Sequence, residues 1–128
     1  RNLGTIVMDL DDLETLNLNA LGNTDTVIVN DLAGTDLTTM KIDLAGTIGG
    51  TVGDAAADTV IVNGTALPDT IIIRATGGTV EVSGLTPLVR IEHSEVAYDG
   101  LIVNGLGGTD TITTDYGVNT LIGVTANQ

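Results

Sequence analysis

A twelve-residue unit occurs three times in the chain and constrains its fold more than any other feature. The copies begin at Asp25, Asp58 and Asp99, which places them 33 and 41 residues apart. Each copy opens with an Asp, contains an aliphatic triplet followed by an Asn, and reaches a second Asp eleven residues after the first. Offsets of this size match the length of one coil in a repeat architecture. The repeat therefore predicts that equivalent residues of the three copies stack on one another.

Strand-forming residues dominate the rest of the chain. Segments rich in Thr, Val and Ile alternate with Gly, Asn, Asp and Pro, which is the pattern of short strands separated by turns. No segment places apolar residues at helical spacing over several turns, so we expect almost no helix. The expected strands are 5–10, 14–21, 25–32, 38–44, 58–65, 69–76, 79–85, 88–96, 100–106, 110–115 and 120–124, with a Gly-rich break over 45–57.

Two all-β architectures compete. The Asn-Gly pairs at 63–64 and 104–105 favour hairpin turns and hence an antiparallel β-sandwich. We expect instead a parallel β-solenoid of about three coils, similar to a right-handed β-helix or β-roll, because the repeat has a coil-sized period. Continuous apolar triplets, as in the first copy, are also typical of parallel strands.

A structural role is predicted for the Asn of each copy. Asn30, Asn63 and Asn104 hold the same position in the three units. Stacked coils would align their side-chain amides, which could then form a hydrogen-bonded ladder buried at a turn. A hairpin architecture gives no reason for this repetition.

The aliphatic triplets predict a core and an outer surface. Side chains alternate along a strand, so we expect Val27, Val29, Val60, Val62, Leu101 and Val103 to face inward. Ile28, Ile61 and Ile102 would then align on the outside as an aliphatic stripe. A monomeric protein seldom leaves such a stripe in water. The stripe predicts that the segment contacts neighbouring repeats of the same chain or copies of itself.

The charge of the chain limits its partners. Seventeen Asp and Glu against four Lys and Arg give a formal net charge of −13. This balance argues against binding to nucleic acid and against an anionic membrane surface, which both require positive charge. No apolar run is long enough to span a bilayer, so we expect no membrane insertion. The chain lacks Cys and does not begin with Met, and we interpret residues 1–128 as one segment of a longer repetitive protein.

Residues 99–112, with the run Gly-Gly-Thr-Asp-Thr-Ile at 107–112, resemble sequence of the bacterial RTX proteins, the hemolysin-type calcium-binding proteins. The resemblance is to the β-helical segments beside their nonapeptide arrays. The D-x-U part of the RTX repeat, with U a large apolar residue, matches at Asp25, Asp58, Asp69, Asp99 and Asp110. The Gly-rich part matches only at 107–108. The resemblance implies a β-helical fold and an extracellular or cell-surface location.

The same residues suggest calcium as a ligand. Calcium takes six to eight oxygen ligands from carboxylates and turn carbonyls. The candidates follow Gly-containing turns: Asp54, Asp58, Gly107, Gly108 and Asp110. The competing interpretation is that these Asp residues cap turns by accepting backbone N–H groups.

Right-handed β-helices include polysaccharide lyases and hydrolases, so the expected fold makes an enzymatic role a further hypothesis. Hydrolysis of glycosides uses clustered carboxylates, and no complete motif of this kind is present. His93 and Ser94 are adjacent, so in a strand they point to opposite faces and do not form a nucleophile pair. We expect a non-enzymatic structural or assembly module of a secreted or cell-surface bacterial protein: a spacer, an adhesin stalk or a self-associating fibre unit. The alternative is a calcium-responsive binding module, and a polysaccharide-active enzyme is a third hypothesis.

Overall fold

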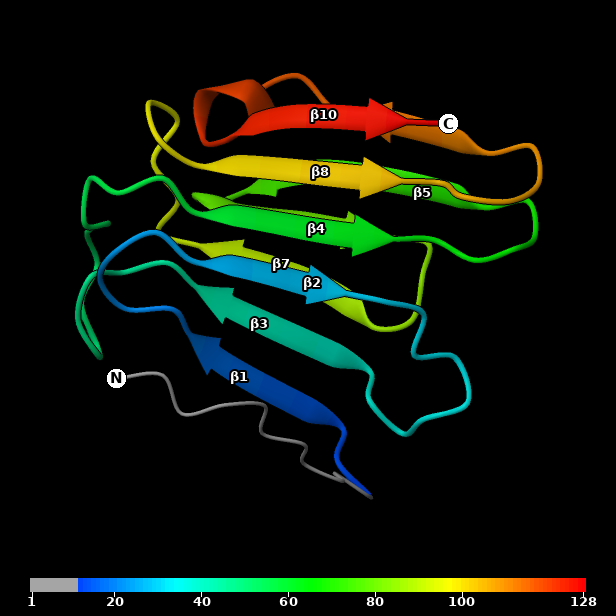
Figure 1. Cartoon of the computed structure of the whole chain (residues 1–128), viewed down its shortest axis with the longest axis horizontal. Coiled ribbons are helices and arrows are strands. Elements are labelled where there is room, and N and C mark those ends of the chain that lie inside the picture. The colour runs from blue at the N-terminus through cyan, green and yellow to red at the C-terminus, as the bar shows by residue number, and fades with distance from the viewer. Residues whose placement is uncertain (1–11) are drawn as a thin grey trace.

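The computed structural model describes residues 12–128, which form ten short strands and one turn of 3-10 helix (Figure 1). The strand predicted at 5–10 lies outside the described residues. The elements are β1 (Thr15–Asn19), β2 (Thr26–Val29), β3 (Thr39–Asp43), β4 (Thr59–Asn63), β5 (Thr70–Thr76), β6 (Thr79–Ser83), β7 (Leu88–Glu92), β8 (Gly100–Asn104), β9 (Thr111–Thr114), η1 (Val118–Thr120) and β10 (Gly123–Asn127).

The strands form two sheets that lie on either side of one hydrophobic core (Figure 1). The four-stranded sheet has the order β10-β8-β4-β2, and all its strands run parallel. The six-stranded sheet has the order β1-β3-β7-β6-β5-β9 and is mixed. Its two antiparallel pairs are β5 with β6 and β6 with β7. The remaining pairs are parallel.

The predicted parallel β-solenoid is wrong, because the two sheets do not close into uniform coils. The antiparallel sandwich is not observed either, since six of the eight strand pairs in residues 12–128 are parallel. The architecture combines the parallel pairing expected of stacked repeats with a local antiparallel meander. Neither predicted architecture combines parallel strand pairs with an antiparallel meander.

A two-residue turn at Gly77-Gly78 is the physical reason for the difference. Both glycines adopt positive φ, 56° and 87°, which is the conformation of a tight hairpin turn. The turn reverses the chain between β5 and β6, and β6 then pairs with β7. The meander therefore separates β5 from β7, and it is β7 that pairs with β3. The Asn-Gly pairs, in contrast, end parallel strands and make no hairpin.

The strand segments predicted from sequence are found in residues 14–115, each shortened at one or both ends. The last one, 120–124, is wrong, because η1 includes Thr120 and β10 begins only at Gly123. Val118 and Ile122 are fully buried, so the apolar residues of this segment cover the core from a turn. In residues 12–128, no helix has the length and apolar character that a membrane span requires.

The core consists of aliphatic layers contributed by alternate residues of both sheets. Five of the six predicted core residues are buried: Val29, Val60, Val62, Leu101 and Val103. Val27 is partly buried and packs against the same cluster. The six-stranded sheet supplies the opposite wall through residues such as Ile42, Ile73 and Ile91. Stacked aliphatic side chains fill the space between the sheets, so the core is packed without any Phe or Trp.

Truncation of one core side chain tests this packing. Val62 is 2% exposed, so Val62→Ala should lower the free energy of unfolding by about 1–3 kcal/mol. Ile28 lies on the opposite face of the same sheet and is 55% exposed, so Ile28→Ala should cost less than about 0.5 kcal/mol. Urea unfolding of both variants measures the difference. Equal losses of stability would contradict the assigned inward and outward faces.

Candidate functional site

The Asp that opens each copy joins neighbouring strands of the parallel sheet. Oδ1 of Asp58 accepts the backbone N–H of Asp25 at 2.8 Å, and Oδ1 of Asp99 accepts the N–H of Asp58 at 3.1 Å. The second oxygen of Asp99 accepts the N–H of Glu95 at 2.7 Å. Asp58 and Asp99 are both buried. The repeated Asp therefore connects one copy to the next through its backbone.

The Asp that closes the second and third copies makes the same kind of contact at the other end of the strands. Oδ1 of Asp110 accepts the N–H of Asp69 at 2.9 Å, and Asp69 in turn accepts the N–H of Thr65 at 2.7 Å. A Cβ on Gly64 would lie 2.6 Å from the Asp69 carboxylate and 2.7 Å from the carbonyl oxygen of Gly105. This close approach explains why Gly follows the Asn in the second copy, whereas Asp31 follows the Asn of the first copy.

The five residues predicted to bind calcium come from two Gly-containing turns, and the structure keeps these turns apart. Asp54 and Asp58 precede β4, whereas Gly107, Gly108 and Asp110 follow β8. Because β4 and β8 run parallel, the two groups lie at opposite ends of the sheet.

Asp54 also accepts backbone N–H groups. Its two carboxylate oxygens accept the N–H of Asn23 and, at 2.9 Å, the N–H of Ala56. The hydrogen bonds from Ala56 and Asn23 lower the pKa of this exposed carboxyl. Asp54 therefore makes the contacts that turn capping requires.

Electrostatic repulsion is concentrated at Asp58. Burial raises the pKa of Asp58 above its ordinary value of 3.8, and the hydrogen bond from Asp25 offsets this only in part. The negative charges of Asp99, Asp54 and Asp25 raise the pKa further. One oxygen of Asp25, Oδ2, is buried without a hydrogen-bond partner. The start of the parallel sheet therefore concentrates negative charge.

The Asn side chains form a continuous ladder across the parallel sheet. Nδ2 of Asn63 donates to Oδ1 of Asn30 at 2.9 Å, and Nδ2 of Asn104 donates to Oδ1 of Asn63 at 2.8 Å. Asn127, which the sequence reasoning missed, continues the ladder by donating to Asn104 at 2.7 Å. The ladder lies on the outer face of the sheet and is only partly buried, in contrast to the buried turn that was predicted. Backbone hydrogen bonds run beside it, as from the Gly64 N–H to the Asn104 carbonyl at 2.7 Å.

Two substitutions test whether the amide donors of the ladder stabilise the folded chain. Asn63→Asp removes one donor and places its new oxygen against Oδ1 of Asn30, so we expect a loss of about 1–2 kcal/mol in the free energy of unfolding. Asn30→Asp is the control, because Nδ2 of Asn30 donates to no described residue. It should cost less than about 0.5 kcal/mol. Urea unfolding at neutral pH measures both. A loss for Asn30→Asp as large as that for Asn63→Asp would contradict the role of the ladder.

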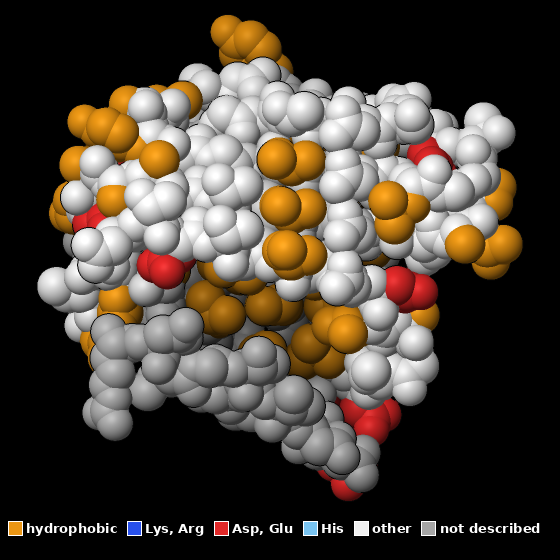
Figure 2. Space-filling view, viewed as in Figure 1, with side chains coloured by type: hydrophobic (Ala, Val, Ile, Leu, Met, Phe, Trp, Pro, Cys, Tyr) orange, Lys and Arg blue, Asp and Glu red, His pale blue; other side chains and the backbone are white. Residues whose placement is uncertain are grey.

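The predicted stripe residues are aligned on the same outer face. Ile28 pairs in register with Ile61, Ile61 with Ile102, and Ile102 with Thr125 of β10. Figure 2 shows a column of hydrophobic side chains in the middle of the face that β2, β4 and β8 form, and the register places these three residues there. The ladder and the stripe are therefore parallel rows on one surface.

A cluster of metal-ligating groups lies on the other sheet. Asp43 at the end of β3 and Glu92 at the end of β7 are neighbours in register, and His93 follows Glu92. One ligand atom from each of the three residues lies within 4.8 Å of the others. A carboxylate pair with an imidazole is a donor set that suits a divalent transition metal.

Each member of this cluster already has a partner in the protein. His93 Nδ1 lies 2.7 Å from Asp43 Oδ1, and Glu92 forms an ion pair of 2.9 Å with Lys41. Burial would raise the pKa of Asp43, but hydrogen bonds from His93 and Ala45 and the positive charges of His93 and Lys41 outweigh it and lower that pKa. Within the protein, the cluster is therefore held by the His93–Asp43 hydrogen bond and the Glu92–Lys41 ion pair.

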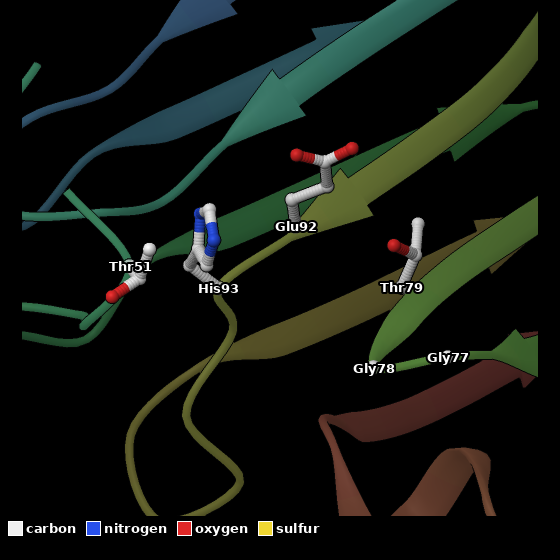
Figure 3. A pocket seen from close by; sticks show the side chains of 6 residues that line it. All are labelled: Thr51, Gly77, Gly78, Thr79, Glu92 and His93. Carbon is white, nitrogen blue, oxygen red and sulfur yellow. The ribbon is translucent and has the colours of Figure 1, made fainter. Parts of the chain in front are cut away.

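A polar pocket of about 390 Å³ opens beside the cluster (Figure 3). Glu92 and His93 line it from the end of β7, Thr51 lines it from a loop, and Gly77, Gly78 and Thr79 line it from the hairpin. The sequence showed His93 and Glu92 as charged neighbours, but it gave no sign of Asp43. Only the pairing of β3 with β7 brings Asp43 to them, because Asp43 and His93 are 50 residues apart in the sequence.

The pH dependence of stability should distinguish Asp58 from Asp43. Ionisation of Asp58 weakens the fold as the pH rises, because its pKa in the folded chain is above 3.8. Asp58→Asn keeps an oxygen acceptor for the Asp25 N–H and does not ionise. We expect this variant to be at least as stable as the wild type at pH 7, with its advantage disappearing below about pH 4.

Asp43 is the matched opposite case. Its ionised form stabilises the folded chain above pH 3.8, and this contribution is lost as the pH falls through its lowered pKa. Asp43→Asn should therefore reduce stability at pH 7 and less so in acid. Urea unfolding across this pH range measures both variants. Equal destabilisation of the two at pH 7 would rule out the repulsion at Asp58.

Comparison with known proteins found no family model, no curated protein and no solved structure that matches this chain. The resemblance to RTX proteins therefore stays a prediction that rests on the D-x-U residues and on the pair Gly107-Gly108.

Proposed function

We propose that the chain is a structural module of a secreted or cell-surface bacterial protein, which serves as a spacer, stalk or assembly unit. The observation that supports this most is the use of the repeated residues. The Asp and Asn side chains of the unit bond the backbone or the side chains of the neighbouring copy. If these Asp and Asn side chains bound a ligand, they would instead direct their oxygens toward a shared cavity.

The proposed location rests on the RTX resemblance and on the composition. A chain without Cys forms no unwanted disulfides in an oxidising extracellular environment, and a strongly acidic surface keeps such a chain dispersed. The proposal is for a non-enzymatic protein. In its support, a hydrogen bond joins Asp43 to His93 and an ion pair joins Glu92 to Lys41, so these side chains have partners within the protein.

A calcium-responsive module is the second candidate. The gathering of carboxylates at Asp58 favours it. Burial is the largest cause of the raised pKa of Asp58, and the charges of Asp99, Asp54 and Asp25 raise it further, a repulsion that a bound cation would relieve. Asp54 and Asp58 lie on one loop, so these two predicted ligands are close in the chain. Against it stands the engagement of both carboxylates with backbone N–H groups.

Thermal unfolding with and without calcium decides between the two functions. A ligand that binds only the folded state raises the melting temperature. For a structural module we expect the same melting temperature in chelator and in millimolar calcium, after correction for ionic strength with magnesium. A calcium-responsive module would melt higher in calcium than in magnesium, and Asp58→Asn would remove the difference. That outcome would overturn the proposed structural function.

A further inference from the structure

We propose that Asp43, Glu92 and His93 bind one divalent transition-metal ion beside the polar pocket of the six-stranded sheet. The inference goes beyond the proposed structural function and does not depend on it, since a metal can cross-link the strands of a structural module. It is also separate from the calcium candidates, because none of those residues belongs to this cluster.

Two features of the backbone bring the three side chains together. Asp43 and Glu92 are partners in register, so their side chains lie on the same face of the sheet. A continued strand would point His93 to the other face, but β7 ends at Glu92 and His93 adopts a positive φ of 58°. His tolerates this conformation better than most residues. The imidazole therefore lies with the carboxylates, and Figure 3 shows the side chains of Glu92 and His93 next to each other.

The imidazole distinguishes this cluster from ordinary acidic groups on a surface. Calcium and magnesium take oxygen ligands, whereas imidazole nitrogen suits zinc, copper, iron and nickel. One donor atom from each of the three residues already lies within 4.8 Å of the others. Small side-chain rotations would bring all three to the roughly 2.0–2.2 Å that zinc requires. The donor set thus favours a transition metal over calcium.

The metal would take the place of a proton. Nδ1 of His93 lies 2.7 Å from Oδ1 of Asp43, so a hydrogen bond now joins two of the donor atoms. Nε2 of His93 has no hydrogen-bond partner among residues 12–128, and it can carry the ring proton while Nδ1 binds the metal. Glu92 supplies the third ligand. Lys41 competes for Glu92 through their ion pair of 2.9 Å, but the Lys41 side chain is 39% exposed and can turn toward solvent.

The pocket supplies room for the remaining ligands. Three protein ligands leave the fourth position of a tetrahedral zinc ion to water. The pocket of about 390 Å³ is lined by Glu92 and His93 and has space for several waters. The net charge of −13 also attracts cations to the protein. Geometry, donor chemistry and charge therefore agree on a metal ion at this place.

Zinc titration of the whole chain tests the proposal. His93 is the single His of the sequence, so the imidazole signals in a proton NMR spectrum report on this site alone. We expect zinc to bind at one ion per chain in calorimetry and to shift these signals, and calcium at the same concentration to leave them unchanged. His93→Asn, which tolerates the positive φ, and Glu92→Gln should each weaken zinc binding at least about tenfold.

Glu81→Gln is the matched control. Glu81 forms an ion pair with Arg90 on the same sheet but is not part of the cluster, so its loss should leave zinc affinity unchanged. Lys41→Gln should tighten zinc binding, because it removes the competitor for Glu92 and a positive charge beside the metal.

Three results would overturn the proposal, each in chains shown to be folded by urea unfolding. They are no zinc binding at millimolar concentration, equal zinc affinity of the wild type and His93→Asn, and an equal loss of affinity in Glu81→Gln and Glu92→Gln. None of them bears on the structural function, which the calcium experiment tests separately.

Discussion

Hydrogen bonds between equivalent residues of successive copies set the register of the parallel sheet, and the other features depend on that register. A shift by one residue would exchange the inward and outward faces of a strand and expose Val60 and Val62. The Asp carboxylates and the Asn amides bond only when the copies are aligned without such a shift. Polar contacts at both ends of the strands thus select the same alignment that the aliphatic core requires.

The parallel sheet could be predicted because its determinants are local and repeated. Each copy contains its own triplet, Asn and Asp residues, so comparing the copies aligns β2, β4 and β8 directly. The six-stranded sheet could not be derived in this way, since β6 and β7 belong to no repeated unit. Gly77-Gly78 was a recognisable hairpin signal between two strands. Which strands then paired with β6 and β7 depended on contacts distant in sequence.

The candidate site shows the same limit. The positions of Asn63 and Ile61 follow from the repeat, whereas the approach of Asp43 to His93 follows from β3 pairing with β7. Charged side chains are also distributed unequally between the two sheets. In residues 12–128 the basic side chains lie on the mixed sheet, and the parallel sheet has an uncharged outer surface. The two faces of the molecule therefore offer a partner different chemistry.

The hydrogen bonds beside the Asn ladder also bear on the chemical lifetime of the protein. An Asn followed by Gly is prone to deamidation, in which the glycine nitrogen attacks the side-chain amide and releases ammonia. Both such pairs in the ladder have this nitrogen engaged, since the N–H of Gly64 bonds to Asn104 and that of Gly105 to Asn127, each at 2.7 Å. Gly64 and Gly105 are also buried. Attack on the amide requires these hydrogen bonds to break first, so the backbone pairing beside the ladder also protects the ladder amides from ageing.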